Sequence, residues 1–259
     1  MFELGNAQIG AWVGQFMLPL FRVAALLMSM PIIGTQLVPT RVRLYLALAI
    51  TLLLVPNLPG LPAVDALSVR ALAMIAQEVL IGVMLGFALQ LFFHVFVVAG
   101  QLLAMQMGLG FASMMDPANG ISVPVLGQFF NMLVVLLFLG MHGHLVVLEI
   151  LAESFVTLPV GGAGLTTMHL WEIAGRLGWV FGAGLLLVLP AITALLVVNL
   201  AFGLMTRAAP QLNIFSIGFP LTLVLGLVIV WVTMADIGAQ YQQIAAETLI
   251  WLRQLARIP

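Results

Sequence analysis

Long apolar runs dominate the chain, and their length and spacing are those of helices rather than strands. Residues 11–33 form the first run, which is long enough to span a bilayer. A short basic connection, residues 38–43, leads to a weaker run at 44–58 that ends among prolines. Residues 71–104 then form an unbroken run that would measure about 51 Å as a helix, against about 30 Å for a hydrocarbon core. A helix of this length must tilt, bend or project into a protein assembly.

The second half of the chain continues the helical pattern. Runs at 125–141 and 145–158 flank a turn, a loop follows at 161–164, and runs at 171–206 and 214–235 predict a hairpin joined through 207–213. The tail, residues 236–259, has apolar residues at helical spacing, which predicts an amphipathic helix at the membrane interface or on a partner. Pro19, Pro31, Pro190 and Pro220 lie inside apolar runs and predict bends. The sequence therefore predicts an all-α membrane protein of long, kinked helical hairpins. The distribution of arginines between the loops does not decide how the protein is oriented in the membrane.

One segment lacks both helical and strand periodicity. Residues 105–120, here called the Met/Gly segment, contain four of the fifteen methionines, and Asp116 is their only charge. Irregular backbone at membrane depth is tolerated only where protein buries it or where it lines a cavity. Methionine is flexible, so a cluster of it can repack around different partners. The segment is therefore either the lining or stopper of a cavity, or a plain connection. The candidate residues are Met105, Met107, Gly108, Gly110, Phe111, Met114, Met115, Asp116 and Pro117.

Composition narrows the possible functions. The chain is 63% hydrophobic and 7% charged, whereas soluble domains are about a quarter charged, so it is an integral membrane protein. A net charge of −1 gives no basic surface for nucleic acid. All cations are arginines, which excludes a Walker-type phosphate loop and a Schiff-base lysine. The absence of cysteine excludes disulfides and thiol chemistry. We expect no cofactor and no enzymatic activity, and we expect the N-terminal run to be retained rather than cleaved.

An arginine stands at the middle of the first apolar run. A central arginine costs about 2.5–3.5 kcal/mol to insert, so Arg22 should face protein or water. Glu78 and Glu149 are its possible acidic partners. A buried structural ion pair is favoured over a direct role in transport.

Other intramembrane polar and small residues fall on defined helix faces. Gln90, His94 and Gln101 share one stripe of the long helix, which favours hydrogen bonding between helices over a wet channel. Gly82 with Gly86, and Gly178 with Gly182, form small faces that permit close helix packing.

Catalytic and metal patterns are weak. His142 and His144 are close in sequence, but Glu149 and Glu153 lack the spacing of a His-Glu-x-x-His site, so a polar turn is favoured over a metal. No Gly-x-Ser-x-Gly elbow is present, and a membrane hydrolase has no recognisable nucleophile–base pair in this sequence.

The longest distinctive stretch is Asn199-Leu-Ala-Phe-Gly-Leu-Met-Thr-Arg-Ala-Ala-Pro-Gln-Leu-Asn-Ile-Phe-Ser-Ile-Gly-Phe-Pro-Leu-Thr-Leu223. It closely resembles the signature of the FliR/SctT family, the flagellar and virulence export-gate proteins of type III secretion. Further matches stand in the family's order: Arg22-Val-Ala-Ala-Leu, Val38-Pro-Thr-Arg-Val-Arg-Leu, Gly108-Leu-Gly-Phe-Ala, Asp116-Pro-Ala and Gly143-His-Leu. The resemblance covers essentially the whole chain, and its flagellar branch is preferred over the virulence branch.

The resemblance implies a specific assembly. One FliR-type subunit joins five FliP-type and four FliQ-type subunits in a right-handed helical hetero-oligomer, the export gate of the bacterial inner membrane and flagellar basal body. Residues 1–165 would be the FliP-like part, and residues 166–259 the FliQ-like hairpin and tail. FlhB-like and FlhA-like components would be further partners, and the substrates would be unfolded flagellar proteins. Membrane lipid would surround the assembly.

The resemblance also implies roles for individual residues. The family's pore plug maps onto the Met/Gly segment, in which Phe111, Met114 and Met115 are expected to contact the pore axis. Asn199 and Arg207 would serve in assembly, with Arg207 either capping helix carbonyls or docking a partner subunit. The rival function, a small-molecule secondary transporter, would require paired broken helices in an internal repeat, and the two halves show no convincing repeat.

Overall fold

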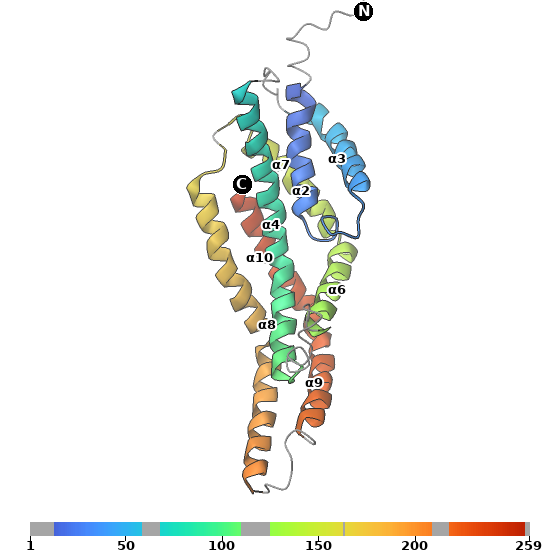
Figure 1. The fold of residues 1–259 in the computed structure, drawn as a ribbon, viewed down its shortest axis with the longest axis vertical. Helices are drawn as coiled ribbons and strands as arrows, with labels where there is room; N and C mark the ends of the chain where they lie inside the picture. The colour runs from blue at the N-terminus through green and yellow to red at the C-terminus, as the bar shows by residue number, and fades with distance from the viewer. Residues whose placement is uncertain (1–12, 59–67, 110–124, 163, 209–217, 257–259) are drawn as a thin grey trace, which may run out of the picture. The chain divides into compact units, whose positions relative to one another are not determined.

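The computed structural model describes residues 13–58, 68–109, 125–162, 164–208 and 218–256, and every regular element in these ranges is helical (Figure 1). A π-helical turn η1 (Val13–Met17) precedes α2 (Leu18–Ser29), α3 (Thr40–Leu54) and the 3₁₀ turn η2 (Val55–Asn57). The remaining elements are α4 (Val69–Gln106), α6 (Val125–Gly140), α7 (Gly143–Thr157), α8 (Thr167–Ala208), α9 (Phe219–Thr233), the 3₁₀ turn η4 (Met234–Asp236) and α10 (Ile237–Leu255). The all-α prediction is confirmed.

The helices are long and apolar enough for a membrane protein. Within the described ranges, four stretches could cross a bilayer by length and composition: Thr40–Asn57, Val69–Gln106, Thr167–Ala208 and Phe219–Leu255. A fifth arises if α6 and α7 are counted as one broken span. These stretches support the prediction of an integral membrane protein.

The chain forms two compact units, and α4, α8 and α10 contribute residues to both. Unit 1 comprises residues 1–91, 142–176 and 247–259, and unit 2 comprises residues 92–141 and 177–246. Each unit therefore combines helices that lie far apart in the sequence.

The prediction of one spanning segment over 11–33 is wrong at its C-terminal end. Helix α2 stops at Ser29 and belongs to a short apolar stretch, Gln15–Ser29. Met30 is extended (φ −72°, ψ 147°), as expected for the residue before a proline, because the proline ring clashes with a helical neighbour. The backbone then turns through Ile32, whose φ is +75°, and Gly34 N–H donates to the Met30 carbonyl (3.0 Å).

The predicted basic connection, residues 38–43, is partly helical. Helix α3 begins at Thr40, so Arg41 and Arg43 lie in its first turn. The Arg43 guanidinium folds back and donates from Nη2 to the carbonyls of Val38 (2.9 Å) and Thr35 (3.2 Å). Arg43 thereby fixes the turn between α2 and α3.

The four prolines differ in their place relative to the helices, and the bends predicted at Pro19, Pro190 and Pro220 stay predictions. Pro19 and Pro220 lie in the first turns of α2 and α9, and α2 directly follows the π-helical turn η1. Pro31 follows the end of α2, and Pro190 lies inside α8. The turn between α6 and α7 was located correctly, since His142 adopts the left-handed conformation (φ +58°).

The C-terminal tail forms the predicted helix, α10, but its apolar face packs on its own chain. In unit 1, Trp251, Leu252 and Leu255 are buried, and Leu252 lines a small cavity together with residues of α2, α4 and α7. In unit 2, the Tyr241 ring packs against Phe92, with 5.6 Å between the ring centroids. The sequence predicted that this apolar face lies on the membrane surface or on a partner protein. For the buried residues named here, both predictions are wrong.

Candidate functional site

In unit 1, α2 and α4 approach closely along a seam of small residues. A Cβ added to Gly82 would lie 2.8 Å from the Ala25 Cβ and would collide with the Arg22 carbonyl oxygen. A Cβ added to Gly86 would collide with the Ser29 hydroxyl, which donates to the Ala25 carbonyl (2.7 Å). The predicted close packing at Gly82 and Gly86 is confirmed.

The second predicted small face has no partner within the described chain. Around Gly178 and Gly182 of α8, no described atom lies within 4 Å of an added Cβ. Two glycines four residues apart therefore allow close helix packing on α4, whereas on α8 they lie on a surface that no described residue contacts.

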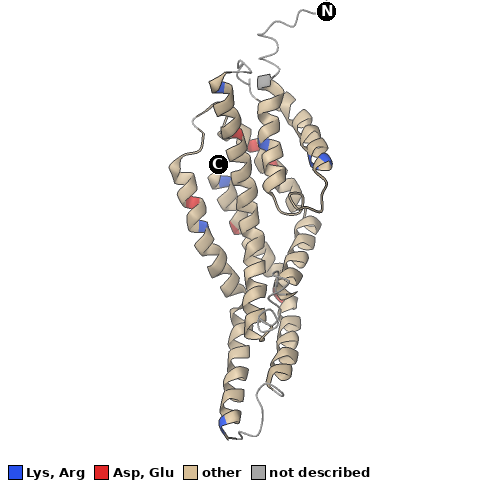
Figure 2. Cartoon of the chain, in the orientation of Figure 1, with Lys and Arg blue, Asp and Glu red and all other residues tan. Residues whose placement is uncertain are grey.

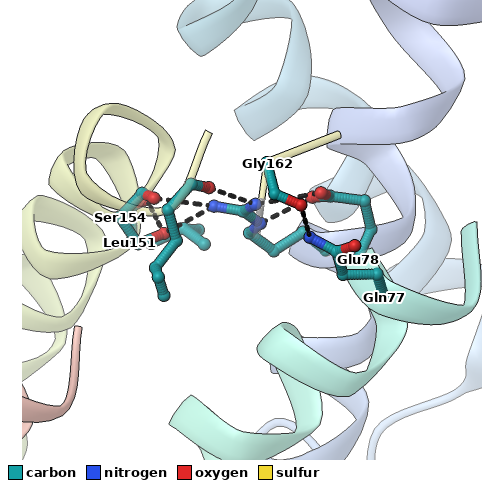
Figure 3. Close-up of polar contacts among 7 residues, drawn as sticks. Gln77, Glu78, Leu151, Ser154 and Gly162 are labelled. Atoms are coloured by element: carbon teal, nitrogen blue, oxygen red, sulfur yellow. Dashed lines mark hydrogen bonds and ion pairs between the residues drawn. The ribbon is translucent and has the colours of Figure 1, made fainter. Parts of the chain in front are cut away.

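Arg22 lies on the α2–α4 seam and uses every N–H of its guanidinium group. Figure 3 shows the polar contacts around Glu78 and Ser154. Nε and Nη2 donate to the two carboxylate oxygens of Glu78, at 2.6 and 3.0 Å. Nη1 donates to the carbonyl and the hydroxyl of Ser154, at 2.8 and 3.2 Å. Nη2 also donates to the Leu158 carbonyl at 2.8 Å. A guanidinium group has five N–H donors, so these five acceptors satisfy it completely.

The Arg22 cluster, defined as Arg22, Glu78, Ser154 and Leu158, joins three helices in the interior of unit 1. The side chains of Arg22, Glu78 and Ser154 are fully buried. The Leu158 carbonyl lies at the C-cap of α7, where helix carbonyls lack intrahelical partners, so Arg22 caps that end. The Ser154 carbonyl already accepts from the Leu158 N–H (2.9 Å), and Arg22 adds a second bond to it.

The pairing answers the question that the sequence left open. Arg22 pairs with Glu78, whereas Glu149 lies 3.7 Å from Arg253 in an exposed contact. The Phe155 ring lies 4.2 Å from the Arg22 guanidinium carbon, which adds a cation–π contact. Because every donor of Arg22 is occupied and no part of it reaches solvent, the cluster can fix helix positions but cannot take up a ligand.

The loop after α7 packs on α4 beside this cluster (Figure 3). Gln77 Nε2 donates to the Gly162 carbonyl at 3.4 Å. Gly164 has a φ of +65°, and a Cβ there would lie 2.7 Å from Gln77 Cδ. Sequence analysis missed Gln77 and Ser154, because a lone amide or hydroxyl in an apolar run does not show which helix it will meet.

The predicted polar stripe of α4 divides between the two units. Gln90 Nε2 donates to the Ser29 carbonyl at 2.5 Å, which confirms a structural hydrogen bond in unit 1. In unit 2, His94 is exposed on the chain surface, and the Gln101 side chain lies beside Gly127 of α6. The three residues of the stripe therefore have different surroundings and do not share one role.

The Met/Gly segment begins with an ordered helix end. Helix α4 continues to Gln106, so the prediction of irregular backbone from Met105 onward is wrong by two residues. Gly108 N–H donates to the Met105 carbonyl (3.1 Å), and Leu109 N–H donates to the Ala104 carbonyl (2.9 Å). With Gly108 at φ +81°, these bonds form a Schellman motif that terminates the helix. Gly108 is needed here for its left-handed conformation.

Residues of α8 and α9 hold this helix end in unit 2. Met107 is fully buried, and a Cβ added to Gly226 of α9 would lie 2.5 Å from Met107 Cγ. Asn199 of α8 donates from Nδ2 to the Gln106 carbonyl at 3.4 Å. The segment therefore starts from a docked root, consisting of Gln106, Met107 and Gly108. Sequence analysis missed Gly226, because an isolated glycine in an apolar helix does not reveal which side chain fills the space.

Of the other candidate residues of the segment, Met105 is described, and its side chain is exposed. Gly110, Phe111, Met114, Met115, Asp116 and Pro117 lie outside the described residues. The expected contact of Phe111, Met114 and Met115 with the pore axis, and the place of all six in a plug, stay predictions.

The helix end at Gly108 gives the first testable prediction. Gly108→Val should lower the free energy of unfolding by about 1–2 kcal/mol, because a β-branched residue is strained in the left-handed conformation. Gly108→Asn should cost less, since asparagine adopts this conformation readily. Thermal unfolding of the two purified variants measures the difference. Equal melting temperatures would argue against the Schellman motif.

The remaining candidate positions show no metal or catalytic geometry. The rings of His142 and His144 are 6.1 Å apart between centroids, at the predicted polar turn. Among the described residues, no group of three or more His, Cys, Asp or Glu side chains could hold a metal ion. Arg207 lies in the last turn of α8 and is exposed.

Comparison with known proteins gives a consistent result over most of the chain. The family model for bacterial export proteins, family 1, matches residues 13–248. The flagellar biosynthetic protein FliR of Escherichia coli (strain K12) is 43% identical over 227 residues, which are 88% of this chain and 87% of that protein. The protein of the same name from Pectobacterium carotovorum is 42% identical over 216 residues, covering 83% and 82% of the two chains. That from Aquifex aeolicus is 31% identical over 218 residues, covering 84% of each.

Proposed function

This chain belongs to family 1 of the bacterial export proteins, and we propose that it is a core subunit of the flagellar type III protein export gate, with the Met/Gly segment as the plug of its pore. A role in flagellar export follows from the flagellar relatives. The family is a component of an export apparatus, consistent with a protein that is not an enzyme. In this proposal, unfolded flagellar proteins cross the inner membrane through the gate.

The observation that supports the plug is the way the Met/Gly segment begins. A plug must stay attached at one end while its remainder moves or repacks. The docked root supplies such an attachment, because Met107 is buried against Gly226 and Asn199 bonds the last residue of α4. Beyond it, methionine and glycine provide side chains and backbone that can seal without fixing one shape.

The partners proposed for the gate are those of the family resemblance. Five FliP-type and four FliQ-type subunits would join one copy of this chain, with FlhB-like and FlhA-like components beside them. The proposed FliP-like part (residues 1–165) and FliQ-like part (residues 166–259) follow sequence resemblance rather than compactness, since each compact unit contains residues of both parts. The proposal places the assembly in the bacterial inner membrane at the flagellar basal body.

Deletion of residues 110–115 tests the plug. The deletion begins after Leu109, so it leaves the Schellman motif and the docked root in place. We expect the assembly to form and its resting conductance to small ions to rise, measured as current across planar bilayers that contain the purified gate. Replacing the same six residues by alternating glycine and serine is the control for segment length, and it should leak to an intermediate degree. An assembled gate with unchanged conductance would refute the plug.

A further inference from the structure

The last turn of α4 completes its hydrogen bonding with a residue of α8. The final carbonyls of a helix lack intrahelical partners and need other donors. Backbone N–H groups of the last turn and of the residues that follow it satisfy three of them, the carbonyls of Leu103, Ala104 and Met105. The next one, the Gln106 carbonyl, accepts from Asn199 Nδ2 at 3.4 Å. Within the described residues, Asn199 therefore supplies from another helix the bond that the backbone of this turn does not make.

The side chain of the docked root fills a notch in the buried face of α9. Thr222, Gly226 and Val230 are buried and follow one another at intervals of about one helical turn. Gly226 has no side chain, so it leaves a notch between the other two. Met107 is fully buried, and a Cβ added to Gly226 would lie 2.5 Å from Met107 Cγ and 2.8 Å from its sulfur. The contact is apolar, and Figure 2 shows α9 without a charged residue.

Helix α6, which follows the Met/Gly segment, begins against α4 by a different kind of contact. A Cβ added to Gly100 would lie 2.6 Å from the Leu126 carbonyl oxygen and 2.8 Å from Gly127 Cα. The level of Gly100 is about 12 Å of helix from Gly108, so α4 holds the chain on both sides of the residues between them. The contact at Gly100 is formed by the backbone of α6, whereas the docked root depends on α8 and α9.

We propose that Gly226 and Asn199 are positioning residues of the export gate, which hold the docked root against α8 and α9 and thereby determine how tightly the resting gate is sealed. This inference rests on the proposed function of the Met/Gly segment as the plug. Methionine is unbranched and has three rotatable bonds, so the seat of Met107 is set by the shape of the notch rather than by the stiffness of its own side chain. Asn199 fixes the backbone of the same turn.

A disulfide tests the seat directly. Because the chain has no cysteine, Met107→Cys with Gly226→Cys introduces the only thiol pair in it. The new sulfur at position 107 takes the place of the methionine Cγ, 2.5 Å from a Cβ at position 226, so the bond should form on oxidation. The oxidised gate, purified with its FliP-type and FliQ-type partners, should conduct like the wild type across planar bilayers. Reduction should raise the resting conductance, since two free thiols need more space than a bonded pair. Failure of the disulfide to form, or a conductance that does not change on reduction, would overturn the proposal.

Single substitutions test the positioning role without a thiol. Gly226→Ala should raise the resting conductance of each assembled gate about tenfold, the ratio that corresponds to about 1.4 kcal/mol, within the usual cost of overpacking. The flexible Met107 side chain yields before the backbone of α9 does, so the gate should still assemble. Asn199→Leu keeps a similar volume but removes the donor to Gln106, so it should raise the conductance as well. This variant decides the question if Gly226→Ala fails to assemble.

Two further glycines provide matched controls. Gly82→Ala overpacks the α2–α4 seam, so it should lower the melting temperature without raising the conductance of assembled gates. Gly203→Ala, about one turn after Asn199 in α8, meets no described atom within 4 Å and should change neither quantity. If Gly226→Ala lowered the melting temperature and left the conductance unchanged, its role would be structural only and the proposal would be wrong.

The deletion of residues 110–115 separates this proposal from the plug itself. A deletion that raises the conductance, together with Gly226→Ala and Asn199→Leu gates that conduct like the wild type, would leave the plug in place and refute the positioning role. A deletion that leaves the conductance unchanged would refute the plug, and the positioning role with it.

Discussion

Replacing Arg22 by methionine is expected to lower the free energy of unfolding by about 3–5 kcal/mol, the range measured when one partner of a buried ion pair is removed. Methionine retains much of the apolar volume but none of the five hydrogen bonds. Glu78 would be left buried without its cation, the Leu158 carbonyl would lose the Arg22 donor, and the Ser154 carbonyl would keep only the Leu158 N–H. The melting temperature of the purified chain in detergent should fall by roughly 10 °C. Flagellar protein export should fall with it, because α2, α4 and α7 would lose the bonds that Arg22 makes between them.

A double variant separates charge from geometry. In Arg22→Met with Glu78→Leu, no buried charge remains, so the double variant should be more stable than Arg22→Met alone. It should not reach the wild type, because the end of α7 is still uncapped. Arg22→Lys should also fail to restore stability, since an ammonium group cannot bond both carboxylate oxygens and the α7 carbonyls in this planar arrangement.

The matched control is an arginine in an exposed pair. Arg253 lies 3.7 Å from Glu149, with both side chains about half exposed. Arg253→Met should change the stability by less than about 1 kcal/mol, as exposed ion pairs do. If Arg22→Met and Arg253→Met shifted the melting temperature equally, burial would not be the cause.

The helices were predictable from the sequence because apolar residues run continuously over lengths that only helices reach. Several helix ends were not, and Ser29 shows why. The apolar run continues to Ile33, but the backbone preference imposed by Pro31 ends the helix first. Composition indicated the class of protein, and the apolar runs indicated the order of the helices. Neither signal depends on which distant residues meet in the folded chain.

The candidate site was less predictable, because its partners lie far apart in the chain. Sequence showed that Arg22 needs an acid but offered Glu78 and Glu149 equally, and only tertiary packing selects Glu78. Gly108 illustrates a different limit. It was grouped with the pore residues, whereas its conformation gives it a role in ending α4. A glycine that terminates a helix and one that lines a pore look alike in sequence.

The second large effect is expected at Gly82, where one added methyl group meets backbone rather than a movable side chain. Gly82→Ala should lower the free energy of unfolding by about 1–3 kcal/mol, the typical cost of overpacking. The new Cβ would collide with the Arg22 carbonyl oxygen and lie 2.8 Å from the Ala25 Cβ, so α2 must move away. That movement would stretch the bonds between Arg22 and Glu78. The measurement is thermal unfolding of the full-length chain in detergent.

The same substitution at an open glycine provides the control and decides the cause. At Gly178 of α8, an added Cβ meets no described atom within 4 Å, so Gly178→Ala should be neutral or stabilising by up to about 1 kcal/mol through helix propensity. Opposite signs at positions 82 and 178 would show that the α2–α4 seam, not helix composition, determines the response. Ala25→Gly should rescue Gly82→Ala only in part, because it removes the Cβ contact but leaves the collision with the Arg22 carbonyl. Full rescue would mean that the side-chain contact alone set the cost, and that the position of Arg22 does not depend on how closely α2 approaches α4.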